Sequence, residues 1–360
     1  MSALDAYVGD GIANGRFIGV QAYASVHGQV IVDTGWGVDG RNTPLMPGDL
    51  MALYCASKPV LAVAVASLVA SGDLDLRESV GAAVGRTCEL SSHVAKLSVY
   101  ELLSHRTGLE NLTGVLMGLH TPEERSRTVC FARPSSEYSA GRRAYSEYAG
   151  WHLLSMIVEE VTGLSAVAFV GTLGQRDGVS MPSGLFLAMS QEEFCGNRDR
   201  VRINLVYGSG GKRRPLLMEQ SQRICTELNP SFGGYASMRS LGQFYEELLQ
   251  RRRHNDEFGR VLAAFTTCDG PAAYDPSLDR VCSFGLGFMT DLSSHYYGNG
   301  LSGVSFGHSG NVGALLGCAD PATGLVATIA MLGTRSAETA VYHHRGELMQ
   351  KILEEARLLS

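Results

Sequence analysis

Hydrophobic stretches with the composition and length of β-strands occur near both ends of the chain. Residues 17–26 and 29–34 are separated by a two-residue His-Gly turn, and this arrangement predicts an N-terminal hairpin. Towards the other end, the pattern predicts three further strands at residues 304–310, 312–318 and 325–332. A turn sequence with proline and glycine separates the last two. We therefore expect both ends of the chain to contribute strands.

Helical patterns occupy the chain between and beyond these strands. One segment, residues 60–70, is hydrophobic on every face, which is typical of a helix that is buried on all sides. Glycines, which favour helix ends, stop three of the segments at positions 72, 108 and 163. The pattern predicts helices at residues 5–13, 60–70, 99–109, 151–161 and 337–359.

Strands at both ends and helices between them predict an α+β fold, specifically an α/β sandwich. One antiparallel sheet would be closed by the two ends of the chain and flanked by the terminal helices. A mostly helical lobe would be inserted into it. The expected boundaries place residues 1–72 and 226–360 in the sheet lobe and residues 73–225 in the helical lobe, with an active site in the cleft between them.

The composition is that of an ordinary soluble globular protein, because 45% of the 360 residues are hydrophobic and 18% are charged. The formal net charge of -6 offers no attraction to DNA, RNA or an acidic membrane surface, so neither nucleic acid nor a membrane is an expected partner. The first residues lack the basic and apolar regions of an export signal, and the apolar helix is expected to be too short to cross a bilayer. We therefore expect a cytoplasmic protein.

Eight cysteines are scattered along the chain without a C-x-x-C pair or a cysteine and histidine cluster of zinc-binding spacing. Most are expected to be reduced, small, buried residues. We therefore expect no disulfide framework, no metal site and no cofactor.

The sequence before the apolar helix places a thiol one helical turn before an ammonium group, since Cys55 and Lys58 are three residues apart. Residues at this spacing share a helix face, so both side chains would project together at the helix N-terminus. The helix dipole and the neighbouring lysine both favour the nucleophilic thiolate. A buried structural cysteine beside a lysine that reaches solvent would give the same pattern, so the assignment depends on other motifs.

Two other motifs carry groups that suit such a nucleophile. Tyr145 lies just before the helix predicted at residues 151–161, and a phenol close to a lysine ammonium can transfer protons near neutral pH. His308 lies in a predicted strand and is followed by Ser309 and Gly310. A glycine there lets a substrate approach the backbone and a main-chain N–H point outward. Taken alone, Tyr145 could be a packed tyrosine and His308 an ordinary strand residue.

In this order, the motifs resemble the serine β-lactamase and penicillin-binding-protein family, in particular its class C β-lactamase-like branch of esterases and transacylases. The family pattern is S-x-x-K, then Y-x-N, then K-T-G or H-x-G. The corresponding residues are Cys55-Ala56-Ser57-Lys58, Tyr145-Ser146-Glu147 and His308-Ser309-Gly310. Residues 102–109, 233–238 and 285–288 are also similar to family stretches, so the resemblance runs from about residue 17 to residue 332.

The resemblance implies a β-lactamase/transpeptidase-like fold and roles for particular residues. Cys55 would be the nucleophile, with Lys58 and Tyr145 as its base pair. The backbone N–H groups of Cys55 and Asn311 would form the oxyanion hole, and His308 would line the site from its strand. The implied catalytic residues are Cys55, Lys58, Tyr145 and His308, and the implied substrate-binding residues are Glu147, Ser309, Gly310 and Asn311.

The sequence departs from the family pattern at two positions. Cys55 stands where the family has serine, and Ser57 cannot replace it because the motif places the nucleophile three residues before the lysine. Glu147 stands where asparagine is usual. A carboxylate next to Lys58 would hold the lysine protonated and make it a poorer base. Glu147 could instead bind the ammonium group of an amine substrate, or it could be an exposed glutamate turned away from the cleft.

The implied function is that of an acyltransferase, or transacylase. Cys55 would take an acyl group from a small ester or thioester donor and pass it to a small amine or alcohol, as transacylases of bacterial secondary metabolism and antibiotic biosynthesis do. The alternatives are an esterase or amidase that uses water, and an inactive binding module on the same fold. A β-lactamase or cell-wall peptidase fits less well because those enzymes work outside the cytoplasm. The sequence does not define the oligomeric state.

Overall fold

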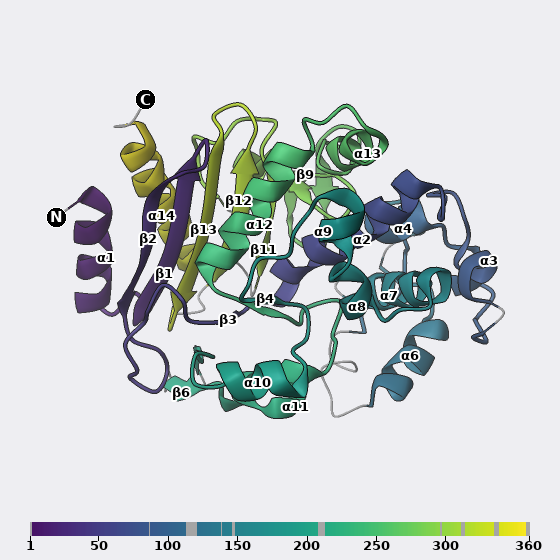
Figure 1. The fold of residues 1–360 in the computed structure, drawn as a ribbon, viewed down its shortest axis with the longest axis horizontal. Coiled ribbons are helices and arrows are strands. Elements are labelled where there is room, and N and C mark those ends of the chain that lie inside the picture. Colours follow the sequence, from purple (N-terminus) through teal and green to yellow (C-terminus); the bar gives the residue numbers. More distant parts are fainter. Residues whose placement is uncertain are drawn as a thin grey trace.

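The computed structural model in Figure 1 describes residues 2–85, 87–112, 121–137, 139–145, 148–207, 213–295, 297–310, 314–334 and 338–357. Two of the predicted site residues, Glu147 and Asn311, lie outside these ranges. The chain forms an antiparallel sheet with helices on both faces and a largely helical region at one end (Figure 1). The α+β fold class predicted from the sequence is confirmed.

In the described part of the chain, eight strands form one sheet in the order β2-β1-β13-β12-β11-β10-β9-β8, and the paired strands are antiparallel. The first and last strands of the chain pair along their full length, so the two chain ends close the sheet as predicted. The bounds are β1 Gly19–Val26, β2 Gln29–Gly37, β8 Ala273–Asp275, β9 Arg280–Phe284, β10 Met289–Thr290, β11 Phe306–Gly310, β12 Leu315–Asp320 and β13 Leu325–Leu332.

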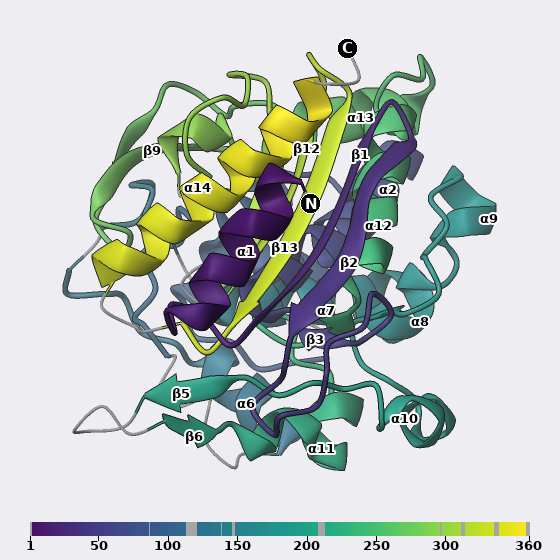
Figure 2. The same ribbon diagram turned by 90° about the vertical axis from the view of Figure 1, so that its left-hand side faces the viewer.

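Helices cover both faces of this sheet and complete the sandwich. On one face, α1 (Ala3–Ala13) packs beside α14 (Glu338–Arg357), as Figure 2 shows. On the other face, α12 (Met238–Arg251) contacts β1, β12 and β13. The helix α13 (Glu257–Phe265) packs between α12 and α2 (Lys58–Ser71), so the central helix α2 lies against the same layer. Most of the buried apolar residues form one core on each face of the sheet, and a smaller separate cluster includes Leu50, Phe194 and Tyr235.

The helix α2 is buried on every side, as its uniform hydrophobicity predicted. Every residue from Lys58 to Leu68 is buried. The helix ends at Gly72, whose φ of 77° lies in the left-handed region that glycine adopts without steric cost. The stretch Tyr54–Ser71 is longer than the sequence pattern indicated, and by length and its mean hydropathy of 1.5 it could cross a membrane. Because 72% of it is buried inside the protein, its apolar character is explained by the core.

The region between α2 and α12 is built from short elements. Their bounds are β3 Met51–Ala52, η1 Tyr54–Ser57, α3 Val80–Val84, η2 Val94–Lys96, α4 Val99–Leu103, α6 Pro122–Cys130, α7 Ala149–Thr162, α8 Ala166–Val170, α9 Leu173–Asp177, β4 Leu185–Phe186, α10 Gln191–Asn197, β5 Leu205–Tyr207, β6 Arg213–Pro215, η3 Leu217–Gln220, α11 Gln222–Thr226, β7 Tyr235–Ala236 and, later in the chain, η4 Leu292–Ser294. The helix α7 is the centre of the region, because it contacts α2, α3, α4, α6 and α8. The region is mostly helical, with a small three-stranded sheet, β3-β7-β4, and a two-stranded sheet, β5-β6, beside the helices.

The helix predicted at residues 99–109 is shorter than expected and ends at Leu103. His105 has a φ of 56°, and the next N–H, that of Arg106, donates to the Glu101 carbonyl at 2.9 Å. This is the left-handed helix ending that glycine usually makes, so the stop comes at the histidine and before Gly108. The strands β8 to β10 and the helices α12 and α13 were not predicted.

Candidate active site

Cys55 lies in η1, a single 3-10 turn that leads directly into α2. Its side chain is half-buried, whereas the next two residues of the turn are buried. The Lys58 N–H donates to the Cys55 carbonyl, so the turn and the helix are continuous. Pro59 follows in the first turn of the helix, where a missing N–H costs no hydrogen bond. A cysteine therefore sits at the N-terminus of a helix that is buried from Lys58 to Leu68.

The Lys58 side chain is fully buried and has partners from separate segments. Its Nζ donates a hydrogen bond to the Ser231 carbonyl at 2.5 Å. The same atom lies 5.3 Å from the Tyr145 ring centroid and 5.7 Å from that of Trp151, at distances where an aromatic face attracts a cation. Lys58 does not reach solvent, so the alternative of a solvent-exposed lysine is wrong.

The loop that carries Ser231 is a part of the site that the motifs did not indicate. The Ser231 hydroxyl donates to the Tyr148 carbonyl at 2.9 Å, and its N–H donates to the Asn229 side chain at 3.1 Å. The Gly234 carbonyl accepts the Leu53 N–H at 3.0 Å, which joins the loop to the residues before Cys55. The family-like stretch at residues 233–238 was the nearest signal, and it begins just beyond the carbonyl that holds the lysine.

Tyr145 is brought to Lys58 by the segment that precedes α7. Its backbone N–H donates to the buried Asp275 carboxylate at 2.9 Å, so the last residue of the edge strand β8 holds this segment in place. The ring is 8% exposed and packs against His105 at a centroid distance of 4.8 Å. The structure therefore brings together the phenol and the ammonium group that the sequence paired, and it adds Asp275 and His105 as their supports.

The strand β11 delivers His308 and Gly310 to the same site. The His308 ring centroid is 5.9 Å from that of Tyr145. Gly310 lies two residues further, on the same face of the strand. It abuts η1 so closely that an added Cβ would lie 2.2 Å from the Leu53 carbonyl oxygen. Glycine is therefore required here, and the contact sets the end of β11 against the backbone beside Cys55.

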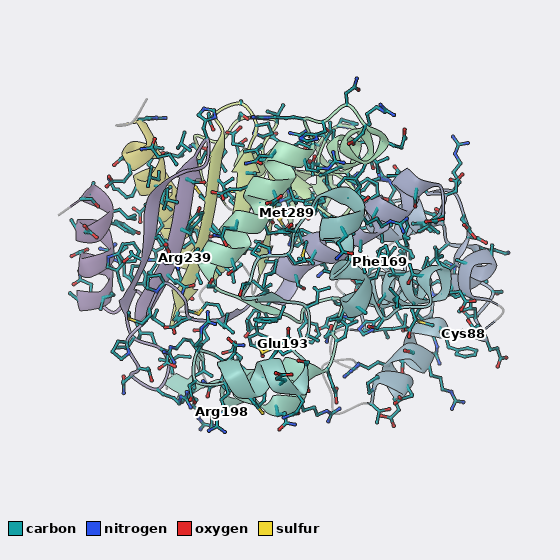
Figure 3. The ribbon with its side chains drawn as sticks, in the orientation of Figure 1. Cys88, Phe169, Glu193, Arg198, Arg239 and Met289 are labelled. Carbon is teal, nitrogen blue, oxygen red and sulfur yellow. The ribbon has the colours of Figure 1, made fainter. Side chains whose placement is uncertain are left out.

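Ser309 has the opposite orientation. Side chains alternate along a strand, and the Ser309 hydroxyl donates to the Met289 sulfur on the neighbouring strand β10 at 3.7 Å (Figure 3 labels Met289). Of the two strand residues predicted to bind substrate, the structure thus brings Gly310 to the site and turns the Ser309 side chain away from it. The predicted residues Glu147 and Asn311 lie outside the described part of the chain.

His308 is a neutral histidine in this environment. Burial, together with the nearby Lys58 charge, lowers the pKa of His308 to about 3. Its Nδ1 lies 2.8 Å from the Ser309 carbonyl and must be the donor, since a carbonyl only accepts. The other ring nitrogen, Nε2, then carries a lone pair, and it has no hydrogen-bond partner among the residues that the structure describes. A neutral acceptor therefore lies beside Tyr145.

Tyr54, the residue before the nucleophile, forms a further contact with Glu219. Tyr54, which precedes Cys55, has a φ of 50°, a left-handed conformation that strains a residue with a side chain. Its hydroxyl donates to the Glu219 carboxylate, whose second oxygen accepts the Asn204 N–H at 2.6 Å. Burial raises the pKa of Glu219 to about 7. The hydrogen bond between Tyr54 and Glu219 anchors the strained turn, and no motif in the sequence indicated this contact.

The sheet, the helical region and the C-x-x-K turn together define a β-lactamase-like fold. A family model described as Beta-lactamase matches residues 4–173 of the chain, which include Cys55, Lys58 and Tyr145. A comparison with curated proteins finds no match.

Solved structures with this fold match almost the whole chain. A penicillin-binding protein homologue from Caulobacter crescentus is 20% identical with a TM-score of 0.76, and the match covers 98% of this chain and 96% of that one. EstCE1, described as a hydrolase with promiscuous acyltransferase activity, is 14% identical with a TM-score of 0.74 over 97% of each chain. A class C β-lactamase from Rhodobacter sphaeroides is 15% identical with a TM-score of 0.71, over 98% of this chain and 99% of that one. At these identities the similarity shows the fold.

The close contact between β11 and η1 leads us to predict that Gly310→Ala destabilises the protein. Because the new Cβ would overlap the Leu53 carbonyl oxygen, one of the two backbones must move, and overpacking of this kind costs roughly 1–3 kcal/mol. We expect a lower melting temperature by circular dichroism and slower reaction at Cys55. Gly303→Ala is the matched control, since nothing lies within 4 Å of its added Cβ. Equal melting temperatures for the wild type and both variants would contradict the described packing.

Proposed function

We propose that this protein is an acyltransferase in which Cys55 is the nucleophile. Cys55 attacks the carbonyl of a small ester or thioester donor, the alcohol or thiol leaves, and the acyl group stays on sulfur as a thioester. A small amine or alcohol then takes the acyl group. The observation that supports this most strongly is the buried Lys58 ammonium, one turn after the half-exposed Cys55 and next to the Tyr145 ring. Such reactions are those of transacylases in bacterial secondary metabolism with the same motif order.

The proton of the thiol must leave during the attack and must reach the departing group. In this proposal Lys58 and Tyr145 act as a pair: the Lys58 ammonium stabilises the Tyr145 phenolate, which takes the proton from the Cys55 thiol, and the Tyr145 hydroxyl then gives that proton to the leaving alcohol or thiol. Their mutual contact and their burial keep them in one arrangement through both steps. The neutral His308 lines the site as a hydrogen-bond acceptor and adds no positive charge.

The negative charge that develops on the carbonyl oxygen needs backbone donors. The N–H groups of Cys55 and Asn311 are the proposed oxyanion hole. The close contact of Gly310 with the Leu53 carbonyl supports a hole that is shared between the end of β11 and the turn that carries Cys55, because it holds these two segments side by side. Asn311 follows Gly310 directly in the sequence.

A sulfur nucleophile favours transfer over hydrolysis. The carbonyl of a thioester gains little resonance from sulfur and reacts with an amine much more readily than with water. In a site that excludes water, the acyl-enzyme can therefore wait for an amine acceptor. We propose further that Glu147 binds the ammonium group of such an acceptor, because a carboxylate is the natural partner of a cation.

The second candidate function is that of an esterase or amidase, in which water accepts the acyl group. The description of EstCE1 supports this candidate, because that protein has the same fold and is described as a hydrolase with promiscuous acyltransferase activity. The third candidate, an inactive binding module, predicts that no ester acylates Cys55. The two experiments that follow separate these functions.

The first experiment removes the proton-transfer groups. Lys58→Met keeps the length of the side chain but removes the ammonium group, and Tyr145→Phe removes the hydroxyl alone. General acid–base groups contribute on the order of 10²–10⁴-fold, so each variant should lose most of its acylation rate while circular dichroism shows a folded protein. Lys351→Met and Tyr274→Phe are matched controls, because both side chains are at least partly exposed and neither is among the partners of Lys58 or Tyr145 described above. Wild-type rates in both Lys58→Met and Tyr145→Phe would show that the base pair is wrongly assigned.

The second experiment decides between transfer and hydrolysis. With a fixed donor and a fixed amine concentration, the wild type should give mostly amide, and Cys55→Ser should give a higher ratio of hydrolysed to transferred product. The reason is that an oxygen ester discriminates less between amine and water than a thioester does. The partition is measured rather than the overall rate, because serine can be slower in a site built for a thiol. If the wild type hydrolyses the donor rapidly and no amine changes the partition, the esterase function replaces the transferase.

A further inference from the structure

Two cysteines that are far apart in the sequence lie side by side in the helical region. The sulfur atoms of Cys88 and Cys130 are 2.8 Å apart, although 42 positions separate them along the chain. Cys88 lies in the loop after α3, and Cys130 is the last residue of α6; Figure 3 labels Cys88 at this end of the molecule. A covalent S–S bond is about 2.05 Å long, so a movement of less than about 1 Å would close the pair.

Backbone hydrogen bonds hold both cysteines in this arrangement. The Cys88 N–H donates to the Val84 carbonyl at 3.0 Å, which ties it to the end of α3. The Ser91 N–H donates to the Cys130 carbonyl at 2.9 Å, which ties the loop of one cysteine to the helix of the other. The proximity of the sulfur atoms is therefore built into the local fold, and it does not depend on side-chain rotation alone.

The two thiols differ in their access to solvent. Cys88 is half-buried, whereas Cys130 is fully buried. Burial, together with the Cys88 thiol, raises the pKa of Cys130 to about 12, so Cys130 reacts poorly with a solute by itself. An oxidant from solution would meet Cys88 first, with Cys130 next to it as the second thiol.

We propose that Cys88 and Cys130 form a site of reversible oxidation that closes to a disulfide when the protein meets a low-molecular-weight disulfide. Cys88 first displaces one thiol from the reagent and forms a mixed disulfide. Cys130 then attacks the Cys88 sulfur, its proton leaves, and the second reagent thiol is released. In total, two protein thiols are oxidised to one disulfide, and one small disulfide is reduced to two thiols. This inference stands apart from the proposed acyltransferase function.

The cross-link would close the chain around a wall of the candidate active site. The segment between the two cysteines contains α4 and His105, and His105 packs against Tyr145 at a centroid distance of 4.8 Å. Closing this segment lowers the freedom of the unfolded chain, so the oxidised protein should be more stable to heat than the reduced protein. Reduction with a dithiol should restore the lower melting temperature.

The test is oxidation of the reduced, full-length protein with oxidised glutathione, followed by alkylation of the remaining thiols, digestion and mass spectrometry. We expect a cross-linked Cys88–Cys130 peptide that lacks two hydrogen atoms and carries no glutathione, and a melting temperature several degrees higher. Cys130→Ser should retain glutathione on Cys88, and Cys88→Ser should leave Cys130 reduced. Cys268→Ser is the matched control, since Cys268 is exposed and has no role in the pair.

Two outcomes for the wild type would overturn the proposal. In one, glutathione remains on Cys88 and no cross-linked peptide forms. In the other, both Cys88 and Cys130 are recovered alkylated although the exposed thiols of Cys195 and Cys268 have reacted with glutathione. Both outcomes are read from the wild type alone, so they hold even if a variant does not fold.

Discussion

The buried ammonium group of Lys58 is the constraint on which the rest of the candidate site depends. A charge that is removed from water must find hydrogen bonds or other polar partners inside the protein. Lys58 finds the Ser231 carbonyl and the faces of Tyr145 and Trp151. These groups come from the loop before β7, the segment before α7, and α7 itself. Packing of the helical region against α2 therefore also assembles the groups around Cys55.

Two other contacts fix the turn that carries the nucleophile. Gly310, at the end of β11, packs against the Leu53 carbonyl, and the Glu219 carboxylate accepts a hydrogen bond from the Tyr54 hydroxyl. The left-handed backbone of Tyr54 costs on the order of 1–3 kcal/mol, and such strain persists where the surroundings over-determine the conformation. These contacts to the two residues before Cys55 explain how a strained residue can precede it, and they leave the thiol half-exposed at the start of the helix.

The sequence predicted those parts of the structure that have a local signal. The long hydrophobic strands at the chain ends and the uniformly apolar α2 were recognisable because burial leaves a periodic pattern. The hydrogen bonds that support the site could not be recognised in this way. Lys58 and Ser231 are 173 positions apart in the sequence, and Tyr54 and Glu219 are 165 positions apart. The early end of α4 was missed because a histidine, not a glycine, takes the left-handed position. The contact between Cys88 and Cys130 was missed for the same reason, because the two residues are distant in the sequence and no spacing motif connects them.

The measurement that tests the central claim most directly is the site of acylation. The protein is mixed with p-nitrophenyl esters and with acyl thioesters of N-acetylcysteamine, and it is examined by intact-mass and peptide mass spectrometry. The account predicts one added acyl group, located on Cys55, that is lost when an amine is supplied and never forms in Cys55→Ala. An acyl group on another residue, or none on a Cys55 thiol that still reacts with an alkylating reagent, would contradict it.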